Sequence, residues 1–156
     1  MHRYYPIRIM PDLWKNLEEL FKAKRIRSHE FVYDEIVPAQ GVKDALAMLA
    51  SKHKVCFQPI TKRQAQLIPE ILGQFPNLID PRSKKGQADP WIIASTIELK
   101  EEANLFAKEF EFILVSTENE RSPNKIPAVC KHYNVRHMNL FEFFEDNGWA
   151  FSVSKK

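Results

Sequence analysis

Phe110-Glu-Phe-Ile-Leu-Val115 is the most strand-like stretch of the chain, because it is almost continuously apolar and stops at the polar residues 116–125. Short apolar runs bounded by polar loops are typical of strands that are covered on both faces of a parallel sheet. A helix is expected after the loop, and residues 135–139 are then expected to form a second short strand. The stretch therefore predicts one strand of a parallel sheet.

Helical patterns occupy most of the chain before this strand. Residues 11–24 carry one apolar stripe opposite charged residues, which predicts an amphipathic helix. Ser28 is predicted to cap a second, short helix, and residues 42–52 are predicted to form a third. Thr61 and Gln64 have the spacing of a capping box, so a fourth helix is expected to begin there.

Two prolines mark the helices that follow. Pro69 lies inside the apolar pattern of the fourth helix, so we expect a kink or an early end there. Pro90 follows Asp89, and a proline in the first turn is typical of a helix start. Because strands and helices alternate, we predict an α/β fold with a parallel sheet covered on both faces, formed by a single domain over residues 1–156.

The composition excludes several classes of protein. The chain has 156 residues, of which 44% are hydrophobic and 28% charged, as in globular proteins. Its four glycines are at positions 41, 73, 86 and 148, too far apart for a phosphate-binding glycine loop. The longest apolar run, at residues 45–50, is much shorter than the roughly eighteen residues of a membrane span. With no signal-peptide pattern at the N-terminus, we expect a cytoplasmic protein without a membrane partner.

The cysteines and the charge balance limit the chemistry further. Cys56 and Cys130 are too few for a disulfide scaffold or a four-cysteine zinc site, so we expect both to be reduced and buried. The formal net charge of +3 allows a polyanionic partner without requiring one. With these kinds of site excluded, the carboxylates are the remaining candidates among the reactive side chains.

Three of the acidic residues have unusual positions. Glu35 lies among apolar residues of a predicted helix, Asp89 begins a helix, and Glu118 follows the strand, where functional groups gather in parallel sheets. Each has a structural alternative: Asp89 as a helix cap, Glu35 as the partner of a surface lysine, and Glu118 as an ordinary loop acid. If the three converge, their mutual repulsion favours a hard divalent cation. Mg²⁺ or Mn²⁺ held by carboxylates is suited to phosphodiester hydrolysis.

These acids stand in motifs that resemble the successive acidic motifs of PIN-domain nucleases: Val32-Tyr-Asp-Glu-Ile36, Ala88-Asp-Pro-Trp-Ile-Ile-Ala94 and Leu114-Val-Ser-Thr-Glu-Asn119. Nearly the whole chain is similar to one bacterial PIN-like family, domain-of-unknown-function family 4411. Four further segments carry that similarity: Arg3-Tyr-Tyr-Pro6, Pro11-Asp-Leu-Trp14, Lys125-Ile-Pro-Ala-Val-Cys130 and Asn139-Leu-Phe-Glu142.

The resemblance implies a fold, a site and a substrate. The fold is a three-layer α/β/α arrangement with a central parallel sheet. The site is a Mg²⁺ or Mn²⁺ centre in which Glu35, Asp89 and Glu118 are both metal ligands and catalytic residues. The substrate is RNA, and many PIN relatives are toxins that pair with an antitoxin protein. Lys84 and Lys85 would contact phosphates; the alternative is that they belong to a solvated loop.

One departure from the family pattern concerns the start of the fold. PIN domains open with an apolar strand that ends in an aspartate, whereas the first aspartate here, Asp12, lies in a predicted helix start and does not match. We expect a truncated or degenerate copy that lacks the first strand and has an impaired metal site. Because the missing strand is central in the PIN-like order, we also expect weak stability or strand exchange within a homodimer.

The sequence therefore predicts a PIN-like, metal-dependent ribonuclease domain, and the toxin role of many relatives extends to it as an expectation. The alternative is a non-catalytic PIN-like module that binds nucleic acid or protein, which the missing first aspartate favours. The three surviving acids favour the nuclease.

Overall fold

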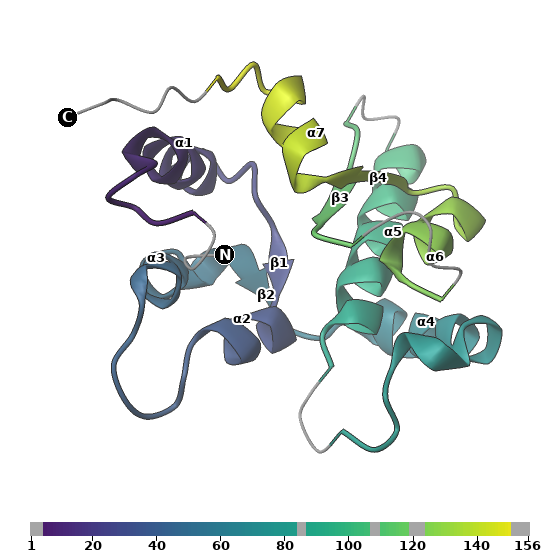
Figure 1. The fold of residues 1–156 in the computed structure, drawn as a ribbon. Coiled ribbons are helices and arrows are strands. Elements are labelled where there is room, and N and C mark those ends of the chain that lie inside the picture. The colour runs from purple at the N-terminus through teal and green to yellow at the C-terminus, as the bar shows by residue number, and fades with distance from the viewer. Residues whose placement is uncertain (1–4, 84–86, 107–109, 119–123, 151–156) are drawn as a thin grey trace. The chain divides into compact units, whose positions relative to one another are not determined.

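The computed structural model describes residues 5–83, 87–106, 110–118 and 124–150 (Figure 1). The chain divides into two compact units: unit 1 takes in Met1–Pro59 and Gly148–Lys156, and unit 2 takes in Ile60–Asn147. Within the described residues, each unit holds one two-stranded parallel sheet together with helices.

The elements of unit 1 follow one another in this order: α1 (Pro11–Lys22), β1 (Ser28–His29), α2 (Glu30–Ile36), α3 (Ala45–Lys52), the 3-10 helix η1 (Lys54–Cys56) and β2 (Phe57–Gln58). The amphipathic helix α1 confirms the prediction, and its apolar stripe is buried through Leu13, Trp14 and Leu17. The indole N–H of Trp14 donates a hydrogen bond to the Tyr5 carbonyl at 2.8 Å, which holds the preceding chain against the helix.

The end of α1 is a Schellman turn with a lysine at the position that glycine usually occupies. The Lys24 N–H donates to the Phe21 carbonyl at 3.0 Å, and the Arg25 N–H donates to the Leu20 carbonyl at 2.9 Å. This pair of bonds defines the motif. Lys24 has a φ of 54°, in the left-handed region that is costly for a residue with a β-carbon.

Two helix starts in unit 1 differ from their predictions. Ser28 belongs to β1, where it lies opposite Phe57, and the cap of α2 is His29, whose ring accepts a hydrogen bond from the Phe31 N–H at 3.3 Å. The prediction that Ser28 caps this helix is therefore wrong by one residue. Helix α3 begins later than predicted, because Asp44 caps it through the Ala47 N–H at 2.8 Å.

The elements of unit 2 follow in this order: α4 (Lys62–Gln74), the 3-10 helix η2 (Pro76–Leu78), α5 (Asp89–Leu105), β3 (Ile113–Ser116), α6 (Ile126–His132), β4 (Arg136–Asn139) and α7 (Leu140–Asp146). The predicted capping box is confirmed: Thr61 Oγ1 accepts from the Gln64 N–H, and the Gln64 side chain accepts from the Thr61 N–H. Thr61 and Gln64 also donate to the Glu98 carboxylate on α5 at 2.7 and 2.8 Å, so this cap joins two helices. Helix α4 continues past Pro69 to Gln74, so the predicted early end is wrong.

Strands β3 and β4 form the parallel sheet of unit 2, in a register that runs from Ile113 opposite Arg136 to Ser116 opposite Asn139. Helix α5 packs against α4, α6 and β3, and α7 packs against both strands. One buried apolar cluster joins α4, α5, β3 and α6: Leu67, Ile71, Leu78, Ile93, Ala94, Ile97, Leu114, Ile126, Val129, Cys130 and Val135.

Both cysteines are free and buried, as predicted. Burial raises the pKa of the Cys130 thiol to about 12. Burial also raises the pKa of the Cys56 thiol, and the positive charges of Lys24 and Arg27 oppose that shift.

The α/β class and the parallel pairing of short strands are confirmed. Within the described residues the strands form two separate pairs, β1 with β2 and β3 with β4. A single domain over residues 1–156 stays a prediction. In the part of the chain that the structure describes, no helix has both the length and the apolar character needed to cross a bilayer.

Candidate functional site

The carboxyl ends of β3 and β4 lie next to each other, because the strands are parallel and Ser116 pairs with Asn139. Helix α5 runs in the opposite direction to β3 (Figure 1), so its first turn lies toward this same end of unit 2. Asp89 is the first residue of α5, and Glu118 follows β3 by two residues. The topology therefore directs two of the three predicted acids to one end of unit 2.

The segment that carries Glu118 is tied to both strands by a short hydrogen-bond chain. Ser116 Oγ lies 2.9 Å from His137 Nε2 on β4. The same hydroxyl oxygen accepts a hydrogen bond from the Glu118 N–H at 3.1 Å. The backbone of Glu118 is thus held in place by side chains from the ends of two neighbouring strands.

The Glu118 carboxylate has two partners of its own. Oε2 accepts from the Ile126 N–H at 2.7 Å, and Oε1 lies 3.5 Å from Lys125 Nζ. Lys125 is the N-cap residue of α6 but makes no side-chain cap, so Glu118 supplies the acceptor for that helix end. With 22% of its side chain exposed, Glu118 is more constrained than an ordinary loop acid.

Asp89 is not the cap of α5. The N-cap position is occupied by Ala88, whose backbone is helical and which makes no side-chain cap. Asp89 therefore belongs to the first turn, where a carboxylate is stabilised by the free N–H groups and the helix dipole. Its side chain is half-buried. The helix begins one residue earlier than the helix-cap alternative for Asp89 assumes, so Asp89 does not occupy the N-cap position.

The remaining predicted residues lie elsewhere. Glu35 is an exposed residue of α2 in unit 1. Lys84 and Lys85 lie outside the described residues. Within the residues that are described, no group of three or more His, Cys, Asp or Glu side chains is arranged to hold a metal ion. The three-carboxylate centre stays a prediction.

The model of the family described as Domain of unknown function (DUF4411) matches residues 1–151. This chain belongs to that family. Comparison with curated proteins and with solved structures gave no match.

The donor chemistry at the β3–β4 end of this DUF4411 chain suits a hard cation. Asp89 and Glu118 offer carboxylate oxygens, the ligands that Mg²⁺ and Mn²⁺ prefer. Mg²⁺ commonly takes only one or two protein carboxylates and completes its shell with water and substrate phosphate. Because each carboxylate oxygen has two lone pairs, the contacts of Glu118 with Ile126 and Lys125 leave acceptor positions available.

Sequence reasoning missed Ser116 and His137 in this DUF4411 chain. Their contact depends on the register between β3 and β4, which no local pattern reports. A signal was present for Ser116 alone: a serine at a strand end, two residues before an acid, is a common way to hold the next N–H. Lys125 belongs to the segment Lys125–Cys130 that carries the family resemblance, but that segment does not predict its contact with Glu118.

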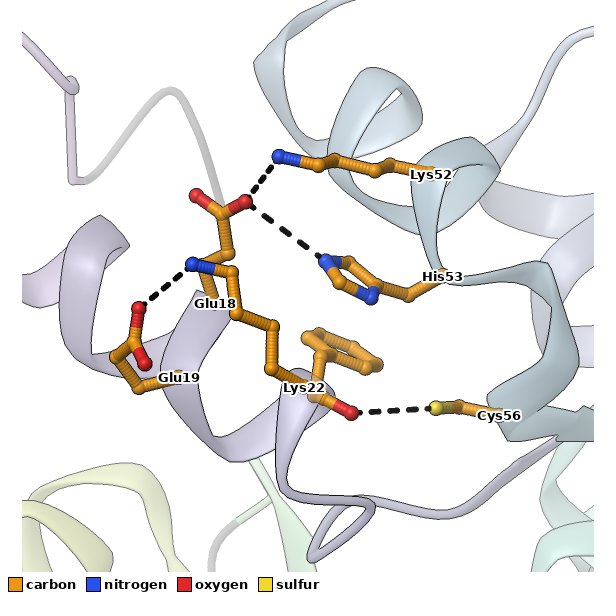
Figure 2. Close-up of polar contacts among 7 residues, drawn as sticks. Glu18, Glu19, Lys22, Lys52, His53 and Cys56 are labelled. Carbon is orange, nitrogen blue, oxygen red and sulfur yellow. Dashed lines mark hydrogen bonds and ion pairs between the residues drawn. The ribbon is translucent and has the colours of Figure 1, made fainter.

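A second polar cluster lies in unit 1 between α1 and α3 (Figure 2). The Glu18 carboxylate accepts a hydrogen bond from Lys52, which lowers the pKa of Glu18, and it lies 3.9 Å from His53 Nε2. His53 stacks on Phe21 at 5.3 Å, whereas Cys56 Sγ contacts the Phe21 carbonyl at 3.7 Å. Figure 2 shows Glu18 of α1 facing Lys52 and His53, so the cluster joins α1 to α3 and to the residue that follows it.

Proposed function

We propose that this chain is a PIN-like ribonuclease domain that hydrolyses RNA with Mg²⁺ or Mn²⁺, in a three-layer α/β/α fold. Asp89 and Glu118 of unit 2 are the ligands on which the proposal rests. One observation carries the proposal: Asp89 opens the helix that runs antiparallel to β3, and Glu118 follows the carboxyl end of β3. Acidic groups beyond the carboxyl ends of parallel strands occupy the usual place for chemistry in α/β proteins.

The contacts of Glu118 support a role as a positioned ligand. Hydrolysis is sensitive to geometry, and a misplacement of about 1 Å can cost on the order of 10²-fold in rate. The Ser116–His137 contact holds the Glu118 backbone, and the Ile126 N–H orients its carboxylate. The ammonium group of Lys125 lies 3.5 Å from the Glu118 carboxylate, where it is placed to meet a substrate phosphate. When bound, a divalent ion would supply charge neutralisation at the scissile phosphate and activation of water.

An RNA digest tests this proposal directly. The chain is incubated with several RNAs and Mn²⁺ or Mg²⁺, with and without EDTA, alongside the variants Asp89→Asn, Glu118→Gln and Glu35→Gln. Glu102→Gln is the matched control, since Glu102 is an exposed acid toward the other end of α5. We expect EDTA-sensitive cleavage that falls by about 10²-fold in Asp89→Asn and Glu118→Gln and is unchanged in Glu102→Gln.

Two results would contradict the proposal. Cleavage that Asp89→Asn and Glu118→Gln leave intact would place the chemistry elsewhere or in a contaminant. No cleavage of any RNA, with metal present, would favour the non-catalytic PIN-like module that binds nucleic acid or protein. The Glu35→Gln variant asks separately whether an acid from unit 1 takes part.

A toxin role follows from the same proposal and has its own test. Expression of the chain in bacterial cells should slow growth by degrading RNA, and Asp89→Asn should abolish that effect at equal protein level. An antitoxin protein would be expected to restore growth by binding the chain. Growth arrest by the Asp89→Asn variant would show that the effect is not nuclease activity.

A further inference from the structure

The turn that joins α1 to β1 carries three basic side chains: Lys24, Arg25 and Arg27, here called the basic turn. All three are exposed. Among the described residues, none of these side chains makes a hydrogen bond or an ion pair. Three like charges within four residues, with no ion pair among the described residues, make this turn a strongly positive part of the surface of unit 1.

The neighbouring acids are committed to other cations. Glu19 pairs with Lys22 at 2.7 Å, and Glu18 pairs with Lys52 on α3. The acids of the last turns of α1 could have neutralised the basic turn, but each instead faces a different lysine (Figure 2). The positive charge of the basic turn is therefore left for an external partner.

The backbone holds this charge in a fixed place. The Schellman bonds to the Phe21 and Leu20 carbonyls define the path of Lys24 and Arg25. Lys24 adopts a left-handed φ of 54°, where glycine would be cheaper. Arg27 directly precedes β1. The positive charges of Lys24 and Arg27 act to lower the pKa of the Cys56 thiol, and Cys56 directly precedes β2. The basic turn therefore lies at the amino ends of both strands.

We propose that the basic turn binds the phosphodiester backbone of the RNA on which the protein acts. This inference rests on the proposed action on RNA. Arginine and lysine contacts to phosphates supply affinity and position without reading sequence. A lipid surface is the less suitable partner, because stable adsorption of a helix needs an exposed apolar face. The apolar stripe of α1 is instead buried through Leu13, Trp14 and Leu17.

The test is the salt dependence of RNA binding. Affinity for a fluorescent single-stranded RNA is measured in EDTA, which separates binding from cleavage, at several salt concentrations. The triple variant Lys24→Gln/Arg25→Gln/Arg27→Gln is compared with Arg8→Gln/Lys15→Gln/Lys62→Gln, which removes the same charge from exposed positions elsewhere. We expect the slope of log affinity against log salt to fall by about 2 in the first variant, at about 0.7 for each lost contact. The second variant should keep the wild-type slope.

A single substitution separates the effect of the charge on RNA binding from any effect on the stability of the fold. Lys24→Gly removes the charge and also relieves the left-handed backbone, so the melting temperature should not fall while the slope drops by about 0.7. Equal slopes for both triple variants, or unchanged binding in Lys24→Gly, would overturn the proposal. Binding to phosphatidylserine vesicles that depends on the basic turn, without an effect on RNA, would overturn it in favour of a membrane.

These results are distinguishable from a failure of the proposed function. RNA binding that depends on the basic turn in a chain that never cleaves RNA would refute the nuclease and keep this inference. Cleavage that persists in the basic-turn variant, with unchanged affinity for RNA, would refute this inference and keep the nuclease.

Discussion

Units 1 and 2 are each built on a two-stranded parallel sheet, but they present different chemistry on different supports. In unit 2 the notable groups are two acids, Glu118 after the carboxyl end of β3 and Asp89 in the first turn of α5, and in unit 1 they are bases that precede the amino end of β1. Among the described residues, Ala50, Cys56 and Phe57 form one buried cluster of unit 1, where the stripe of α1 is buried as well, whereas the buried cluster of unit 2 joins three helices and a strand. A metal site requires carboxylates held in defined positions, while a phosphate-binding surface requires mainly exposed charge.

The largest expected effect is the difference between truncating a fully buried side chain in unit 2 and a half-buried one in unit 1. Ile93→Ala removes a side chain that is 0% exposed in unit 2 and should lower the free energy of unfolding by about 2–5 kcal/mol. Ile36→Ala, the matched change at a half-buried position in unit 1, should cost about 1 kcal/mol. Urea unfolding followed by fluorescence measures both. Equal losses would mean that the difference in burial between these two positions does not decide the cost.

The two buried cysteines extend the comparison to pH. Because burial raises the folded-state pKa of Cys130 from 9.0 to about 12, the unfolded chain loses this proton first as the pH rises. The buried Cys130 thiol therefore makes its full contribution to stability below about pH 9. Above that pH the free energy of unfolding should fall by up to about 1.4 kcal/mol per pH unit. Cys130→Ala should flatten this alkaline slope, and Cys56→Ala should change it less. An identical slope in Cys130→Ala and wild type would exclude Cys130 as the cause.

The third effect concerns the cap that joins α4 to α5. Thr61→Ala removes both the Gln64 N–H acceptor and the bond to Glu98, and should cost about 1 kcal/mol. Thr117→Ala, at an exposed position after β3, is the control and should be near neutral. Thermal unfolding of the two variants measures the difference. A loss of equal size in both would show that the cap is not important for unit 2.

The smallest effect separates the two acids of the proposed site. In metal-free buffer Glu118→Ala should cost roughly 0.5–1 kcal/mol, because it removes the carboxylate that accepts from the Ile126 N–H at the start of α6. Asp89→Asn should cost at most about 0.5 kcal/mol, since Asp89 is a first-turn acid and not a cap. Added Mn²⁺ should stabilise the wild type and neither variant. A larger loss for Asp89→Asn would mean that its main role is structural.

Local chemistry explains which parts of the fold could be predicted. The capping box of Thr61 and Gln64 and the stripe of α1 depend on residues within one or two turns, so the sequence contains the whole signal. Helix starts were misplaced by one residue where a neighbour took the cap, as His29 did beside Ser28. The Ser116–His137 contact and the division into two units depend on pairings distant in sequence, which periodicity does not encode.

Paramagnetic broadening by Mn²⁺ tests most directly whether Asp89 and Glu118 share an ion. Small amounts of Mn²⁺ are added to isotope-labelled protein, and the loss of each backbone amide signal is followed by NMR. The account predicts that signals of the first turn of α5 and of Ser116 to Glu118 fade first and together, and that Asp89→Asn and Glu118→Gln each abolish this selective loss. Selective broadening around a different set of acids, or the same selective loss in both variants, would contradict it.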